Sequence, residues 1–207
     1  METEEEQVEK LKLWWRENGR SVIAGIIIGL GGLFGYRYWG DMKEAEAERA
    51  SSYFNQMIES LEASDATSVS LLAGTLIADY SSTEYAILAR FALARSFVES
   101  EEYTQAQQQL EQIIGTTGQD PLGFLARKRL AAIQLQTASL DQALATLAVD
   151  FPAAFRASVE ELKGDIYAGQ GKLIEAADAY RKAQRGIPGP PDANFLQQKI
   201  DDLGLTG

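Results

Sequence analysis

Two residue types with reactive side chains are missing from this sequence of 207 residues, which contains no cysteine and no histidine. Without cysteine the chain forms neither disulfide bonds nor thiolate metal sites. Without histidine it lacks the commonest proton shuttle and the commonest metal ligand, and a Ser-His-Asp triad is impossible. These absences predict a protein that is not an enzyme and that holds no metal and no cofactor.

Other signatures of enzymes are also absent from the sequence. No Ser-x-x-Lys motif occurs, and no pair of carboxylates lies in the apolar context that would raise the pKa of one of them. The glycine-rich stretch around residue 30 does not fit a nucleotide loop, because Phe34 replaces the third glycine of a dinucleotide fingerprint and no Lys-Ser/Thr pair follows. We therefore expect no small-molecule substrate.

Acidic residues outnumber basic ones, and the formal net charge is −11. From Asp41 onward the chain carries 24 acidic and 14 basic residues. Such a domain repels nucleic acid and anionic lipid headgroups, so its expected partners are proteins. The short run Arg-Lys-Arg at 127–129 is interpreted as a solvated helix face and not as a nucleic-acid site.

A long apolar segment stands near the N-terminus. Residues 21–36 are uncharged and span roughly 24 Å as a helix, or about 28 Å when extended to Trp39. A bilayer core is about 30 Å thick. Trp14 and Trp15 precede the segment, and Tyr38 and Trp39 close it, as the aromatic belts of two membrane interfaces would. The sequence thus predicts a transmembrane helix over 21–39 after a short cytoplasmic tail, 1–20.

Two alternatives to this anchor remain open. A cleaved signal peptide usually ends in small residues, whereas this segment runs into the bulky Gly-Tyr-Arg-Tyr-Trp at 35–39. A core helix of a soluble protein would carry fewer glycines, because glycine weakens a helix in water. An uncleaved signal-anchor is the preferred interpretation.

The orientation of the segment is nearly balanced on charge alone. The basic residues on its N-terminal side are Lys10, Lys12, Arg16 and Arg20, and those on its C-terminal side are Arg37, Lys43 and Arg49. Four against three slightly favours an N-terminus in the cytoplasm.

Glycines recur at helical spacing within the segment. The pairs Gly25 and Gly29, and Gly31 and Gly35, each place two small residues on one helix face. Such faces let a second transmembrane helix approach closely, so these glycines are predicted helix–helix contacts. The alternative is that small residues are simply frequent in membrane helices.

After the apolar segment the pattern becomes that of amphipathic helices, with no alternation typical of strands. Two apolar stripes predict a degenerate helix pair over 41–80. The first stripe is Ala50, Phe54, Met57 and Leu61, and the second is Val69, Leu72, Ala73, Leu76, Ile77 and Tyr80.

A repeat follows over residues 84–188. In its last copy Gly164 predicts a close contact between two helices, Gly171 a turn, and Tyr180 packing onto the next unit. Alanines 106, 143 and 176 recur at intervals of 37 and 33 residues, near the period of 34 residues of a tetratricopeptide repeat, which the copies resemble. We predict three such repeats, at about 87–118, 124–152 and 157–188.

The end of the chain predicts a capping helix. Pro188 and the Pro-Gly-Pro-Pro run break the chain, and Asp192 can cap a final helix over 192–204 that covers the last repeat. The predicted fold class is therefore all-α: a single N-terminal transmembrane helix, then a tetratricopeptide-repeat-like α-solenoid of helix pairs, then a C-terminal capping helix. An unrelated helical bundle is the alternative.

A stack of helix pairs offers a groove lined by the first helix of each pair. The residues at groove-facing offsets are Leu88, Phe91, Arg95, Val98, Leu125, Lys128, Ala132, Leu135, Ser158, Glu161 and Asp165. We predict that they form a peptide-binding groove in which Arg95 and Lys128 meet a carboxylate. Alternatively, some of them pack against the N-terminal helices.

The whole layout resembles the family of ancillary SecYEG translocon subunits. The resemblance rests on the acidic N-terminus, Glu-Asn-Gly at 17–19, the glycine-rich segment that ends Gly-Tyr-Arg-Tyr-Trp at 35–39, and the degenerate repeats. It implies a bacterial inner-membrane protein with a cytoplasmic N-terminus and periplasmic repeats. It also implies association with the SecYEG channel and with a membrane-anchored periplasmic chaperone of the prolyl-isomerase type, to which exported chains are handed.

The resemblance carries over no catalytic residues. A tetratricopeptide scaffold for another envelope assembly, such as division or outer-membrane biogenesis, is the alternative function.

Overall fold

The computed structural model describes residues 4–186 and 192–204, and all regular secondary structure in these ranges is helical. This confirms the predicted all-α fold. The helices are α1 (Glu4–Glu62), α2 (Ala66–Asp79), α3 (Glu84–Glu99), α4 (Tyr103–Thr117), α5 (Pro121–Gln136), α6 (Leu140–Thr146), α7 (Ala153–Gly169), α8 (Leu173–Arg185) and α9 (Asp192–Asp202). The chain divides into two compact units, residues 1–51 and residues 52–207.

In the first unit, residues 4–51 form one continuous helix, the N-terminal part of α1. Residues 4–20 are already helical, so the described part of the predicted tail, 1–20, belongs to α1. Its Glu, Gln, Lys and Leu residues favour helix, and the apolar turns that follow extend it. Neither end of the predicted segment 21–39 coincides with a helix end.

The apolar side chains of α1 are exposed. Ile28 is 74% exposed, Phe34 is 66% exposed and Ile27 is 65% exposed. Within the described residues, α1 is the one helix that is long and apolar enough to cross a membrane. A core helix of a soluble protein would bury these side chains, so the core-helix alternative does not describe this segment.

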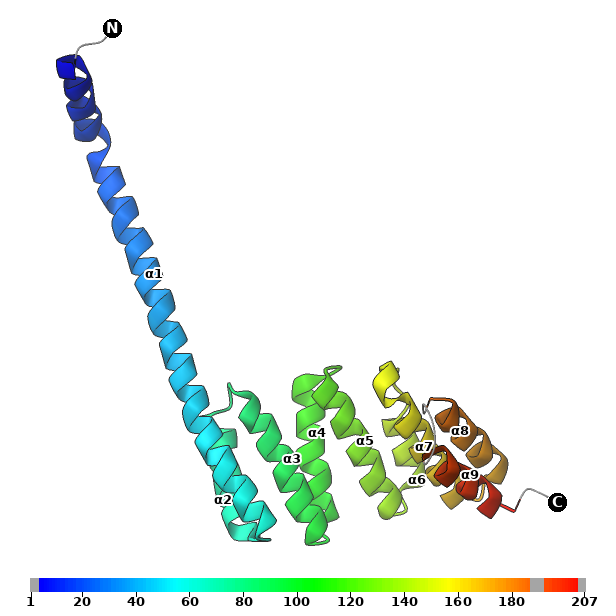
Figure 1. Cartoon of the computed structure of the whole chain (residues 1–207). Helices are drawn as coiled ribbons and strands as arrows, with labels where there is room; N and C mark the ends of the chain where they lie inside the picture. Colours follow the sequence, from blue (N-terminus) through cyan, green and yellow to red (C-terminus); the bar gives the residue numbers. More distant parts are fainter. Residues whose placement is uncertain (1–3, 187–191, 205–207) are drawn as a thin grey trace. The chain divides into compact units, whose positions relative to one another are not determined.

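The second unit is a row of antiparallel helix pairs that follow one another in chain order (Figure 1). The C-terminal turns of α1 pair with α2, and the next pairs are α3 with α4, α5 with α6, and α7 with α8. In the first pair Met57 and Leu76 are fully buried, and the ring of Phe54 lies 5.5 Å from that of Tyr85 on α3. The predicted pair over 41–80 thus lies on the end of α1 and on α2.

The same turn joins the two helices of every pair. One residue in each turn adopts a left-handed backbone conformation, at intervals of 37, 37 and 33 residues: Ser64 (φ 56°), Glu101 (φ 60°), Ala138 (φ 56°) and Gly171 (φ 74°). The next residue donates its N–H to the carbonyl five residues earlier, for example Lys172 to Tyr167 at 2.9 Å. This is the bond that closes a Schellman motif, so the four pairs share one chain reversal.

Small residues on the second helix of each pair allow close packing. Ala106 on α4, Ala143 on α6 and Ala176 on α8 are completely buried. Each belongs to a different apolar cluster, and these clusters follow one another along the row. The predicted alanine period therefore marks the contact points of the stack.

The predicted repeat boundaries differ from the helix ends. The first helices α3, α5 and α7 begin three or four residues before the predicted starts at 87, 124 and 157. Helix α6 has only seven residues, and the chain from Leu147 to Pro152 is not helical. Phe151 of this loop is buried, with ring centroids 5.3 Å from Phe124 and 6.3 Å from Phe155. The loop thereby contributes Phe151 to the apolar cluster that contains Ala143 of α6 and Phe124 of α5.

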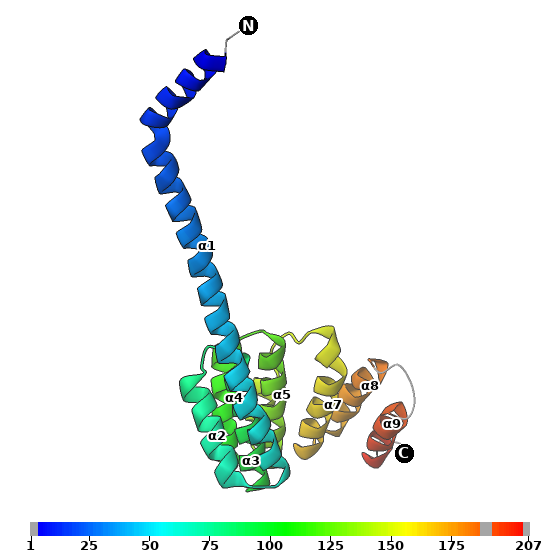
Figure 2. The same ribbon diagram turned by 60° about the vertical axis from the view of Figure 1, so that its left-hand side comes forward.

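Helix α9 covers the end of the row (Figure 2). Leu196 and Ile200 are buried in one cluster with Tyr180 and Ala183 of α8. The predicted stop at Pro188 and the proline-rich break lie outside the described residues. Asp192, which is predicted to cap the helix, is the first residue of α9, and its side chain is not described.

Candidate functional site

The first helices of the repeats carry all the residues predicted to line a groove. Helix α3 carries Leu88, Phe91, Arg95 and Val98; α5 carries Leu125, Lys128, Ala132 and Leu135; and α7 carries Ser158, Glu161 and Asp165. Four of them, Phe91, Arg95, Val98 and Ala132, line one common groove. The others lie elsewhere.

The groove between α3 and α5 has a volume of about 340 Å³. Its lining residues are Phe91, Ala94, Arg95, Val98, Glu99, Leu110, Arg129, Ala132 and Ile133. We call it the α3–α5 groove. The floor is part of the core, since Phe91, Ala94 and Ile133 are buried in the cluster that joins α3, α4 and α5. Val98 and Ala132 are exposed at its surface, so an apolar side chain can settle there without rearrangement of the fold.

Two arginines stand in this apolar groove. The guanidinium of Arg129 lies over the ring of Phe91, with 4.9 Å from Cζ to the ring centroid. Burial, and to a smaller extent the positive charge of Arg95, lowers the pKa of Arg129. Arg95 itself donates to Glu99 at 2.8 Å. No ion pair joins Arg129 to a carboxylate within residues 4–186 and 192–204.

The sequence interpretation missed five lining residues of this groove: Ala94, Glu99, Leu110, Arg129 and Ile133. Arg129 was missed because the pattern predicts one solvated face for the whole run 127–129. A signal was nevertheless present in the sequence. Residue 129 stands one helical turn from both Leu125 and Ala132, which are two of the predicted groove residues.

Lys128 does not reach the α3–α5 groove. Its Nζ lies 3.4 Å from Oγ of Ser158, so it links α5 to α7. Leu125 packs against the cluster around α4, and Leu135 packs against the cluster around α6. Leu88 is half-buried on α3 and is not a lining residue. Of the two predicted carboxylate partners, only Arg95 belongs to the groove.

The acidic end of the predicted groove is occupied by α9. Nζ of Lys199 donates to Oε1 of Glu161 at 2.9 Å and to Oδ1 of Asp165 at 2.8 Å. The hydroxyl of Tyr180 donates to the same Asp165 oxygen at 2.7 Å. In this structure Glu161 and Asp165 therefore hold the last helix and do not face an open groove.

These contacts shift two pKa values. Burial raises the pKa of Tyr180, and its hydrogen bond to Asp165 raises it further. Burial alone would lower the pKa of Lys199, but the hydrogen bonds to Asp165 and Glu161 outweigh that effect, so the pKa lies above its ordinary value. The contacts that dock α9 therefore stabilise the protonated forms of both Tyr180 and Lys199.

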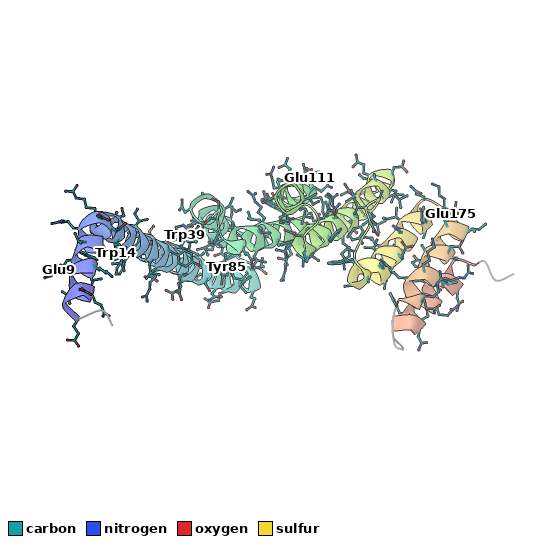
Figure 3. The ribbon with its side chains drawn as sticks, turned by 90° about the horizontal axis from the view of Figure 1, so that it is seen from above. Glu9, Trp14, Trp39, Tyr85, Glu111 and Glu175 are labelled. Carbon is teal, nitrogen blue, oxygen red and sulfur yellow. The ribbon has the colours of Figure 1, made fainter. Side chains whose placement is uncertain are left out.

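The glycines predicted to contact another helix lie open on α1. A Cβ atom added at Gly25, Gly29, Gly31 or Gly35 would meet no atom within 4 Å. The aromatic residues at the ends of the apolar segment are also exposed, and Figure 3 labels Trp14 and Trp39 among them. The described part of the chain contains no cluster of three or more acidic residues able to hold a metal ion.

Comparisons with known proteins match nearly the whole chain. A family profile for a tetratricopeptide repeat-like domain matches residues 12–205. The ancillary SecYEG translocon subunit of Haemophilus influenzae is 31% identical over 98% of this chain and 96% of its own length. The protein of the same name from Escherichia coli is 30% identical over 99% of this chain and 98% of its own length.

A solved structure shows the same fold. The chain titled "MamA RS-1 ArsTM double mutant" superposes with a TM-score of 0.51 at 18% identity, over 75% of this chain and 94% of that one. At this identity the match concerns architecture alone.

Proposed function

Because this chain belongs to the family of ancillary SecYEG translocon subunits with a tetratricopeptide repeat-like domain, we propose that it is a membrane-anchored adaptor that works beside the SecYEG channel. It acts by binding other proteins and not by catalysis. The repeats hold partner segments, and α1 keeps them at the membrane.

The observation that supports the anchor is the exposure of the apolar part of α1. Large side chains such as Ile28 and Phe34 are mostly exposed around the helix. Each costs about 1.5–3 kcal/mol in water relative to an apolar environment, so the stretch needs a lipid surrounding or another transmembrane helix. The open faces around Gly25 and Gly31 suit a close approach by helices of the channel.

We place the N-terminus in the cytoplasm and the repeats in the periplasm of a bacterial inner membrane. The slight excess of basic residues before the apolar segment supports this orientation. On that side the repeats meet emerging exported chains and a membrane-anchored periplasmic chaperone of the prolyl-isomerase type, and the adaptor links the two.

Photo-crosslinking in intact cells tests this function. A crosslinking amino acid replaces Phe91 in the α3–α5 groove, and another replaces Gly29 on the open face of α1. A matched control carries it at Gln108, which is exposed on α4 and lies outside the groove. We expect adducts with the channel from residue 29, and adducts with chaperone or exported chains from residue 91.

Affinity purification in mild detergent separates this function from its rival. We expect SecYEG subunits to copurify with the full chain. Copurification of a division or outer-membrane biogenesis complex without SecYEG would contradict the proposal and identify a scaffold for that assembly.

A further inference from the structure

Basic residues are concentrated on α5, one of the two helices that form the α3–α5 groove. Helix α5 carries three basic residues and no acidic residue, and α3 carries two of each. The chain from Asp41 onward has a charge of the opposite sign, with 24 acidic and 14 basic residues. The groove is thus a locally cationic apolar surface on an anionic domain.

Of the two cations that line the groove, Arg129 is the one without a polar partner among the described residues. Arg95 donates to Glu99 at 2.8 Å. The guanidinium of Arg129 instead lies over the Phe91 ring. This contact uses the flat face of the guanidinium and leaves the N–H groups at its edge available for a hydrogen bond. A cation that lies on an apolar surface without a counterion is a position at which a ligand carboxylate gains a charge-assisted hydrogen bond.

We propose that the α3–α5 groove binds an internal, acidic amphipathic segment of a partner protein. One apolar side chain of the segment settles between Phe91, Val98 and Ala132, and an Asp or Glu about one helical turn away pairs with Arg129. This inference rests on the proposed adaptor function and specifies the chemistry of its ligand.

The form of the groove favours a side-chain carboxylate over a chain terminus. Capture of a terminal carboxylate uses a nest of free backbone N–H groups. The residues of α3 and α5 that line the groove lie inside uninterrupted helices, where backbone N–H groups are already bonded. Arg129 also matches a carboxylate with two parallel N–H donors, which gives the contact a fixed orientation.

Peptide binding to the full chain in detergent micelles tests the inference. Three synthetic peptides with blocked ends share one background and contain Leu-x-x-Glu, Leu-x-x-Gln or Leu-x-x-Lys. Fluorescence anisotropy measures their affinity for the wild type, for Arg129→Gln and for Arg127→Gln. Arg127 is the matched control, because it lies on the same helix but does not line the groove.

The wild type should bind the Glu peptide about tenfold or more tightly than the Gln peptide, and the Lys peptide most weakly. Arg129→Gln should remove this preference, whereas Arg127→Gln should change affinity by about twofold at most. A further variant, Ala132→Glu, puts a carboxylate at the groove surface and should abolish binding of the Glu peptide. Circular dichroism checks that each variant keeps its helical content.

Three results would overturn the inference: equal affinity for the Glu and Gln peptides, no measurable binding of either, or equal losses in Arg129→Gln and Arg127→Gln. None of them bears on the anchor or on the association with the channel. Failure of the wild-type chain to copurify with SecYEG would contradict the adaptor function instead, so the two failures are distinguishable.

Discussion

Tyr180 of α8 lies so close to Gly164 of α7 that a methyl group at position 164 would overlap the tyrosine ring. The ring is almost completely buried, and its hydroxyl donates to Asp165 at 2.7 Å. On its other side Tyr180 packs with Leu196 and Ile200 of α9. One tyrosine therefore sets the distance between the helices of the last pair and holds the capping helix on them.

Replacement of Gly164 by Ala should destabilise the repeat domain by about 1–3 kcal/mol, because the added methyl group forces the Tyr180 ring from its position. The matched control is Gly74→Ala in α2, where an added Cβ meets no atom within 4 Å. That change should stabilise the helix by about 0.5–1 kcal/mol. Thermal unfolding of the full chain, followed by circular dichroism, measures both. Equal melting temperatures for the two variants would contradict the packing described.

The packing of the last helix pair could be predicted from the sequence. Gly164, Gly171 and Tyr180 occur at spacings that follow from helix geometry, so the sequence alone predicts their roles. Alanines 106, 143 and 176, whose recurrence indicated the repeat, are all completely buried. Regular periodicity reports local packing well because each repeat contacts only its neighbours.

Replacement of Ala138 by glycine should stabilise the domain by about 0.5–1 kcal/mol. Ala138 has a φ of 56°, and relief of the left-handed strain exceeds the added entropy of the unfolded chain. The control is Ala132→Gly, at an exposed helical alanine six residues earlier, which should cost about 0.5–1 kcal/mol. Urea unfolding compares the two. A loss of stability in both variants would refute the shared turn geometry.

Replacement of Lys199 by Met should reduce the free energy that holds α9 on α7 and α8 by about 1–2 kcal/mol near neutral pH, because Asp165 and Glu161 lose their counterion. Hydrogen exchange of α9 amides at neutral pH should rise in this variant. Lys182→Met is the control, since Lys182 is exposed on α8 and makes no ion pair among the described residues. Equal protection of α9 in the two variants and the wild type would contradict the docking contacts.

The same contacts predict a loss of stability in alkali. A raised pKa means that the contribution of Lys199 is fully present below its ordinary pKa of about 10.5 and is lost as pH rises through the higher folded value. Tyr180 acts in the same direction, because its pKa is also raised and its neutral form is the stabilised one. The difference in Tm between wild type and Lys199→Met should therefore be constant from about pH 7 to 9 and shrink above about pH 10. A Tm difference between wild type and Lys199→Met that grows with pH would contradict the raised pKa of Lys199.

Replacement of Phe151 by Ala should lower the free energy of unfolding by about 3–5 kcal/mol, because this loop residue fills the core beside Phe124 and Phe155. Ile174→Ala, at a residue that is 68% exposed on α8, should change stability by about 0.5 kcal/mol or less. Chemical denaturation gives both values. A small effect at Phe151 would contradict its place in the core beside Phe124 and Phe155.

Features that depend on contacts between distant residues were not predictable. Helix α6 ends at Thr146, and Phe151 of the loop that follows packs on Phe124 of the preceding helix α5. The occupation of Asp165 by Lys199 joins residues 34 positions apart. The groove position of Arg129 could have been predicted from its spacing to Leu125 and Ala132, but its contact with the Phe91 ring could not, because that contact joins α3 to α5.

Labelling of single cysteines in intact spheroplasts tests the central claim, a membrane anchor that holds the repeats on the periplasmic side. The chain has no cysteine of its own, so Gln7→Cys near the start of α1 and Gln108→Cys on α4 each give one exposed target. A membrane-impermeant maleimide should label residue 108 in intact spheroplasts and residue 7 only after lysis. Labelling of residue 7 before lysis, or of residue 108 only after it, would contradict the account.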